Sequence, residues 1–188
     1  MFHQELNAHA ACFEALSSMG KEISAVGRCL VDGLARGHKI LICGNGGSAA
    51  DAQHFAAEIV CRLEKTRPAQ AALALTTDTS ILTAMANDFS FDVIFTRQVE
   101  ALGQPEDVLI GLSTSGHSDN IVAAIETAHE KGLVTVGLTG RTGGRLKDAA
   151  DQAIIIPAES TQRIQEAHIF ILHVWARQIE QALLEAKG

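Results

Sequence analysis

The segment GNGGSA, residues 44–49, has the composition of an anion-binding loop. It follows an apolar run and precedes a helix-like segment, and glycines at such a turn let backbone N–H groups approach an anion at the positive end of a helix. The same letters fit the G-x-G-x-x-A variant of the dinucleotide fingerprint, but they serve any phosphate or carboxylate. The segment therefore predicts an anion site, and a tight turn without a ligand is the alternative reading.

A second candidate loop, STSGHS at residues 113–118, carries four hydroxyl groups and one glycine. It lies between an apolar run and a helix that should begin near Asp119. Hydroxyl donors and free N–H groups at a helix N-terminus can bind phosphate without a lysine. The alternative is that Ser118 only caps the helix and the other residues form a polar turn.

His54 and Glu58 are candidate metal ligands, because side chains four residues apart on a helix share one face. An ordinary His–Glu hydrogen bond would explain the same spacing. Gln165 and His173 lie within an apolar stretch near the C-terminus, where a buried imidazole needs a partner. For His168 we expect packing or a structural hydrogen bond.

The pattern of apolar residues predicts the elements that must position these side chains. Short apolar runs, separated by helix-length segments, read as strands within 38–47, 71–77, 107–116, 133–140 and 152–158. Helices are expected at about 49–63, 79–86, 91–102, 119–131, 143–150 and 161–185. This alternation predicts an α/β fold with a five-stranded parallel sheet flanked by helices on both faces. The loops GNGGS, STSGHS and TGRTGG then follow strand ends and should line one crevice.

Residues 4–36 predict an N-terminal helical hairpin with Gly20 between its helices, followed by an α/β core at about 38–157 and a long last helix. We expect one domain over 1–188, because the chain has 188 residues of which 47% are hydrophobic. The apolar residues of the last helix, Ile164, Ile169, Phe170, Leu172 and Trp175, are expected at subunit contacts. Phe89, Phe91 and Phe95 are expected in the core or an interface.

Composition excludes several classes of protein. The formal charge of −7 and the scattered basic residues argue against nucleic-acid binding. No apolar run approaches the roughly 20 residues of a membrane span, and the first residues lack the order of a signal peptide. We therefore expect a cytoplasmic location. The four cysteines have no C-x-x-C spacing, so we expect reduced, mostly buried thiols. His3, His9, His38 and His129 have no motif around them and are expected at the surface.

Several motifs together resemble one family. GNGGSAADAQHFAAE, the Arg67-Pro68 turn, TTDTSILTAMANDFSF, QPEDVLIGLSTSG and RIQEAHIFILH are similar to the phosphoheptose isomerases of the sugar isomerase (SIS) family, over about residues 5–185. This resemblance implies an isomerase that converts sedoheptulose 7-phosphate to D-glycero-D-manno-heptose 7-phosphate, an early step of heptose synthesis for lipopolysaccharide. It also implies a homotetramer with active sites at subunit interfaces.

The resemblance also implies roles for single residues. One zinc ion per subunit would be bound by His54, Glu58, Gln165 and His173, and Glu58 and His173 would be the acid/base pair of an enediol mechanism. The implied substrate-binding residues are Asn45, Gly46, Gly47, Ser48, Asn87, Asp88, Ser113, Thr114, Ser115, Ser118 and Gln165.

Some positions leave alternatives open. His117 stands where many relatives carry Asn, and Gln162 where some carry Asp. Gln165 and His173 are eight residues apart, about 12 Å along a helix, so either both reach far or different subunits supply the ligands. Glu58 could be a base or only a ligand, because a carboxylate bound to zinc is a weaker base than a free one.

Two other functional classes compete with the isomerase. A non-catalytic SIS-domain regulator that binds a protein partner, of the replication-initiator-associating type, would share the fold but depart at the metal and acid/base positions, which this chain retains. An NAD-dependent enzyme would bind the ribose through Asp78, but Asp78 lies further from Gly44 than the roughly 20 residues expected. This interpretation also leaves the STSGHS segment unexplained.

Overall fold

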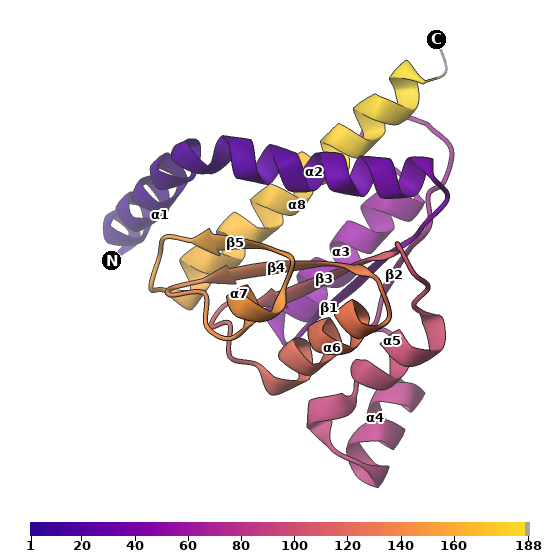
Figure 1. The fold of residues 1–188 in the computed structure, drawn as a ribbon. Helices are drawn as coiled ribbons and strands as arrows, with labels where there is room; N and C mark the ends of the chain where they lie inside the picture. Colours follow the sequence, from indigo (N-terminus) through magenta and orange to yellow (C-terminus); the bar gives the residue numbers. More distant parts are fainter. Residues whose placement is uncertain (187–188) are drawn as a thin grey trace.

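A five-stranded parallel sheet forms the centre of the computed structural model, which describes residues 1–186 (Figure 1). The strands are β1 (Ile40–Gly44), β2 (Ala72–Ala74), β3 (Val108–Ser113), β4 (Val134–Gly140) and β5 (Gln152–Ile156). Their order is β2-β1-β3-β4-β5 and every neighbouring pair is parallel. The expected α/β fold is confirmed. Within residues 1–186, no helix is long and apolar enough to cross a membrane.

Helices cover both faces of this sheet. They are α1 (Phe2–Leu16), α2 (Gly20–Ala35), α3 (Gly47–Val60), α4 (Thr79–Asp88), α5 (Thr96–Leu102), α6 (Asp119–Glu130), α7 (Leu146–Ala149) and α8 (Thr161–Glu185). Successive residues of a strand point to opposite faces. Ile40 and Ile42 of β1 accordingly join a core with α2, α3 and α8, whereas Leu41 and Cys43 join a core with α5 and α6. Two hydrophobic cores therefore share one sheet.

The last helix, α8, is held by α2 and α3 of the same chain. Trp175 is fully buried, and its indole N–H donates to the backbone oxygen of Ile23 in α2 at 2.8 Å. Ile164 and Leu172 are also fully buried within the chain. The expectation that these three side chains lie at subunit contacts is therefore wrong. Only Phe170, which is 43% exposed, and the half-buried Ile169 remain available to a partner.

The two N-terminal helices do not fold back on each other as a hairpin, so this part of the expected fold is corrected. They are joined by a 3₁₀ turn, Ser17–Met19, and Gly20 has helical dihedral angles of φ −57° and ψ −33°. The backbone therefore continues in a helical conformation through Gly20 and does not reverse its direction. α1 runs on from α2 at an angle and projects from the body of the molecule (Figure 1).

Two other expected helices are shorter than predicted. The segment expected as a helix at 91–102 begins with a 3₁₀ turn, Phe91–Val93, and only then forms α5. In the segment 143–150, Gly143 and Gly144 have φ of +89° and +56°, so α7 begins at Leu146. Backbone in this left-handed region cannot belong to a right-handed helix.

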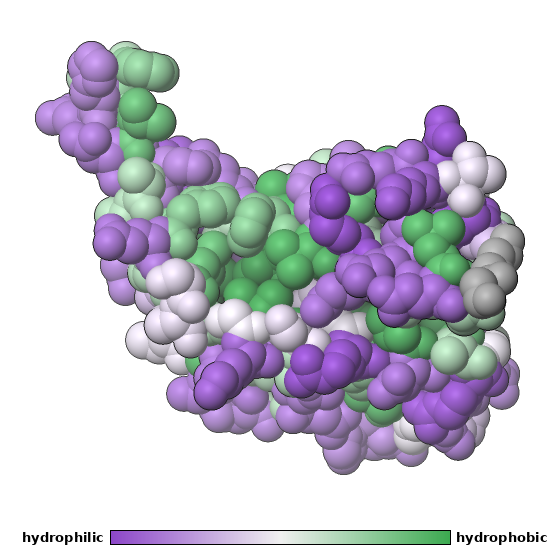
Figure 2. Space-filling view, turned by 90° about the horizontal axis from the view of Figure 1, so that it is seen from above, coloured by the Kyte–Doolittle hydropathy of each residue, from purple (hydrophilic) through white to green (hydrophobic). Residues whose placement is uncertain are grey.

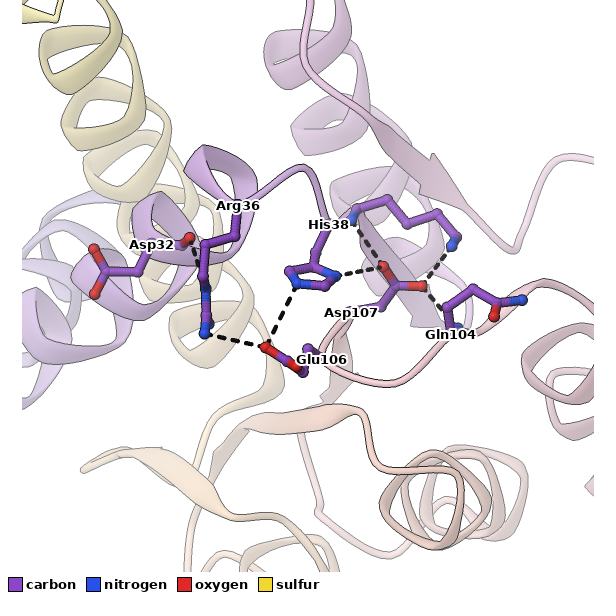
Figure 3. Close-up of polar contacts among 7 residues, drawn as sticks. Asp32, Arg36, His38, Gln104, Glu106 and Asp107 are labelled. Atoms are coloured by element: carbon purple, nitrogen blue, oxygen red, sulfur yellow. Dashed lines mark hydrogen bonds and ion pairs between the residues drawn. The ribbon is translucent and has the colours of Figure 1, made fainter.

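A buried carboxylate ties together the amino ends of β1 and β3, the edge opposite the candidate loops (Figure 3). Asp107 accepts the backbone N–H groups of Lys39 at 2.9 Å and Gln104 at 2.8 Å, and it pairs with the Lys39 ammonium group. Burial raises the pKa of Asp107, but the hydrogen bonds from Lys39 and Gln104 outweigh burial and hold it below 3.8. Beside it, Glu106 contacts Arg36 at 3.1 Å and His38 at 3.6 Å.

Replacement of Asp107 by Asn should destabilise the fold. Its two backbone donors would lose their charged acceptor, so we expect the free energy of unfolding to fall by about 1–3 kcal/mol at neutral pH. The folded pKa lies below the ordinary value, so this stabilisation is fully present well above the pKa of the unfolded chain and is lost as the pH falls through the folded pKa. Urea unfolding of parent and Asp107→Asn should show a difference that shrinks below pH 3.8. A difference independent of pH would contradict this account.

Candidate metal centre and anion loops

Helices α3 and α8 bring His54, Glu58 and His173 to one point. His54 Nε2 lies 3.0 Å from Glu58 Oε1 and 3.0 Å from His173 Nε2, and His173 Nε2 lies 3.4 Å from Glu58 Oε1. The i, i+4 spacing on α3 explains the first contact. The third side chain comes from 119 residues away, so the group is more than an ordinary His–Glu hydrogen bond within one helix.

The chemistry and spacing of these three atoms fit a divalent metal. Ligands bound at about 2.1 Å in a tetrahedral arrangement lie roughly 3.4 Å apart, and two imidazoles with one carboxylate form a known catalytic zinc ligand set. Oxygen Oε2 of Glu58 is buried and has no hydrogen-bond partner among residues 1–186. The side chains of His54 and His173 are 53% and 44% exposed, so one side of the group is open to an incoming substrate.

Asp51 adds a second carboxylate beside this group, which the sequence analysis missed. It precedes His54 by about one helical turn, and the spacing 51, 54, 58 along α3 was the available signal. Burial raises the pKa of Asp51, whereas His54 and His173 lower it, and the first effect is larger. Its Oδ2 atom is buried and has no partner in the described chain.

Gln165 of α8 lies against the first anion loop. A Cβ atom built on Gly47 would come within 2.5 Å of Nε2 of Gln165, so the absence of a side chain at Gly47 lets this amide lie against the loop. The close approach joins the start of α3 to the start of α8. The roles of Gln165 in substrate binding and as a metal ligand both stay predictions.

The first loop is held by a pair of amides. Asn45 Nδ2 donates to Asn120 Oδ1 at 2.8 Å, and Asn120 Nδ2 donates to Asn45 Oδ1 at 3.0 Å. Gly46 has φ +56° and precedes α3, and Ser48 is buried with its N–H bonded to the Asn45 oxygen at 3.0 Å. Asn120 belongs to α6, so this pair fixes the first loop relative to the second. Nothing in the sequence singled out Asn120.

The second loop is organised by its own hydroxyl groups. Ser113 Oγ lies 3.0 Å from Ser118 Oγ and accepts the Gly116 N–H at 3.1 Å, while Ser115 Oγ accepts the His117 N–H at 3.2 Å. Ser118 occupies the N-cap position of α6, but its side chain makes no capping hydrogen bond. The reading of Ser118 as a simple helix cap is therefore not supported. Thr114 and Ser115 are half-buried at the same turn.

The third loop, after β4, supports the second loop through its backbone. A Cβ on Gly116 would lie 1.9 Å from the Gly143 oxygen, and Leu146 donates its N–H to the Gly116 oxygen at 2.9 Å. Arg145 donates to the His117 oxygen at 3.2 Å and pairs with Asp119. These contacts hold the second loop in its turn.

Helix α4 forms one wall of a hollow at the first loop. This hollow of about 330 Å³ is lined by Asn45 and Gly46, by Leu82 and Thr83 of α4, and by further apolar residues. Asn87 and Asp88 are exposed at the end of α4 and bond each other at 2.7 Å. Asp78 accepts the Ile81 N–H at 2.9 Å and so caps α4, a structural role that disfavours the NAD-dependent alternative.

The other singled-out side chains have structural roles or lie at the surface. His168 is fully buried, its Nε2 lies 3.2 Å from the Thr139 oxygen, and burial lowers its pKa to about 4. The expected packing role is confirmed.

Phe95 is buried in the core, as expected, whereas Phe89 and Phe91 are exposed. His9, expected at the surface, is half-buried and contacts Glu166 at 2.8 Å.

Comparisons with known proteins show the family of this chain. The SIS domain family matches residues 6–140. The chain is 52% identical over 171 residues to the phosphoheptose isomerase of Akkermansia muciniphila, covering 91% of this chain and 90% of that protein.

Solved structures give the same answer. The phosphoheptose isomerase of Neisseria gonorrhoeae has a TM-score of 0.85 at 41% identity, covering 96% of this chain and 100% of that one. That of Francisella tularensis has a TM-score of 0.88 at 34% identity, covering 96% and 99%. The chain therefore belongs to the SIS domain family and, within it, to the phosphoheptose isomerases.

Proposed function

We propose that this chain is an aldose–ketose isomerase that converts sedoheptulose 7-phosphate to D-glycero-D-manno-heptose 7-phosphate in lipopolysaccharide heptose synthesis. The observation that carries the proposal is the convergence of His54, Glu58 and His173 on one open point between α3 and α8. The reaction moves a proton between neighbouring carbons through an enediol, which needs a base, an acid and stabilisation of an oxyanion. The convergent side chains supply the first two.

Glu58 is the side chain best placed to move the proton between carbons. It is largely buried, and its Oε1 lies 3.4 Å from Nε2 of His173. In the proposed mechanism its carboxylate takes a proton from C1 of the ketose, His173 gives a proton to the oxygen on C2, and an enediol results. Return of the first proton to C2, with loss of a proton from the oxygen on C1 to His173, gives the aldose.

A zinc ion is part of the proposal, held by His54, Glu58 and His173, with Gln165 as the predicted fourth ligand. When bound, it would polarise the hydroxyl and carbonyl oxygens of the sugar. The fit of the three donor atoms and their open side support a metal, and the choice of zinc rests on the nitrogen-rich ligand set.

The phosphate end of the sugar is assigned to the two anion loops. Ser113, Thr114, Ser115 and Ser118 offer hydroxyl groups at the start of α6, and the Asn45–Asn120 pair holds the first loop beside them. Binding energy at the phosphate can align the reacting carbons. The predicted contacts of Gly46, Gly47, Ser48, Asn87 and Asp88 belong to this proposal.

A homotetramer with active sites at subunit contacts, located in the cytoplasm, completes the proposal. Phe170 is 43% exposed beside a hollow that it lines together with Leu63 and His173. Phe2 and Leu6 on α1 are also exposed. Figure 2 shows hydrophobic side chains gathered in a concave surface next to the projecting α1. The exposed apolar side chain of Phe170, in the same hollow as His173, favours a partner subunit there.

A non-catalytic regulator with this fold is the second candidate, and the same cluster argues against it. A protein that only binds a partner has no need of two imidazoles and a buried carboxylate within 4.8 Å. Relatives at 52% identity are named as isomerases.

Replacement of Glu58 by Gln tests the proposed chemistry. Gln keeps the size of the side chain and removes the proton acceptor, so turnover of sedoheptulose 7-phosphate should fall at least about 10²-fold while substrate still binds. Exchange of the C1 or C2 hydrogen with solvent, followed by NMR, should fall equally. Glu126→Gln, on the exposed side of α6, is the matched control and should be unchanged. Parent-like exchange in Glu58→Gln would remove Glu58 from the role of base.

Light scattering tests the proposed assembly. At micromolar concentration the parent should have the mass of four chains, and Phe170→Asp should lower that mass because a charge would be buried against a partner. A parent that is monomeric at this concentration, while active, would overturn the tetramer and the shared active site together.

A further inference from the structure

A buried carboxylate on α8 fastens the segment that follows α3. Glu180 is 5% exposed, and its two carboxylate oxygens accept the backbone N–H groups of Glu64 and Lys65 at 2.9–3.1 Å. Burial raises the pKa of Glu180, but these hydrogen bonds and the nearby Arg67 hold it below its ordinary value. The carboxylate therefore stays charged and fixes the backbone of residues 64–65 to α8.

A buried guanidinium fastens the same segment to the end of α3. Arg67 is 8% exposed and donates to the backbone oxygen of Glu58 at 2.5 Å and to that of Ile59 at 2.7 Å. The last four carbonyl groups of a helix have no partner within the helix, and a cation there also complements the helix dipole. Arg67 thus holds the turn of α3 that carries Glu58.

These two contacts act on the two helices that form the metal centre. Glu180 follows His173 by seven residues on α8, which is about two turns and returns to the same helix face. Arg67 binds the backbone of Glu58 itself. Because residues 64–67 connect the two contacts, the separation of α3 and α8 at Glu58 and His173 depends on both. Because metal–ligand distances must stay within about 0.2 Å of their ordinary values, the metal site is sensitive to this separation.

We propose that Arg67 and Glu180 are positioning residues of the metal centre, which hold Glu58 and His173 at the spacing that a divalent metal requires. The inference rests on the proposed metal site. Neither residue belongs to the cluster of His54, Glu58 and His173. They act on the affinity of the site for the metal, as do residues in other metal sites that bind and orient the ligand side chains.

The chain offers a matched control for a purely structural role. Asp107 is 2% exposed and accepts two backbone N–H groups, as Glu180 does, but it also pairs with the Lys39 ammonium group and lies at the amino edge of the sheet (Figure 3). Asp107→Asn and Glu180→Gln therefore remove the same kind of interaction at two places. A structural role alone predicts the same result for both.

The experiment measures zinc affinity and stability separately. Metal-free parent, Glu180→Gln, Arg67→Lys and Asp107→Asn are titrated with Zn²⁺ against a chromophoric chelator, and their urea unfolding is followed by circular dichroism. We expect the zinc Kd to rise at least about tenfold in Glu180→Gln and Arg67→Lys. In Asp107→Asn the zinc Kd should stay at the parent value, although the free energy of unfolding is lower. Arg67→Lys keeps the positive charge but loses the forked geometry of the guanidinium group. This variant therefore still tests the proposal if Glu180→Gln does not fold.

Three results would overturn the inference. Parent-like affinity in folded Glu180→Gln or Arg67→Lys would show that the metal centre does not depend on them. An equal loss of zinc affinity in Asp107→Asn would show that general destabilisation of the fold explains the loss in all three variants. A parent chain that binds no zinc would overturn the metal assignment as well, which separates failure of the proposed function from failure of the positioning role alone.

Discussion

The packing of α3 against α8 is the contact on which the candidate site depends. Phe55 and Ile59 of α3 are buried in the same core as Ile171 and Trp175 of α8. Along the same pair of helices, His54 and Glu58 meet His173 on the open side. The hydrophobic contact between the helices therefore brings the polar groups together, and the proposed role of Arg67 and Glu180 is to hold their final spacing. A metal centre at such a contact needs no loop of its own, and its geometry is as rigid as the core.

The anion loops are placed by the sheet. β1 and β3 are neighbours and parallel, so the loops that follow them leave the sheet at the same edge. The Asn45–Asn120 pair and the packing of Gly143 on Gly116 then fix these loops to each other. Gln165, whose amide lies on Gly47, connects the loops to α8. One ligand could thus be held by its phosphate at the loops and by its reacting carbons at the helix pair.

The sequence predicted the features that depend on local pattern. The bounds of α8 agree with the expected helix because its apolar spacing runs without a break, and the strands follow from short apolar runs. Gly20 was misread because glycine permits a turn but does not require one. Asn120 and Glu180 were not singled out, and Arg67 was named only as part of a turn, because the roles of these residues arise from contacts that the sequence pattern does not show. Glu180 and Glu64, for example, are 116 residues apart. The metal cluster was predicted only through the family resemblance, since spacing on α3 alone did not separate it from an ordinary hydrogen bond.

Diffraction from a crystal of the protein grown with zinc, measured on both sides of the zinc absorption edge, would locate the metal directly. We expect one anomalous peak per subunit, at a zinc ion bound by His54 Nε2, Glu58 Oε1 and His173 Nε2. The open side of this ion should face the first loop. An anomalous peak at other residues, or no peak in protein that turns over sedoheptulose 7-phosphate, would contradict the proposed metal centre.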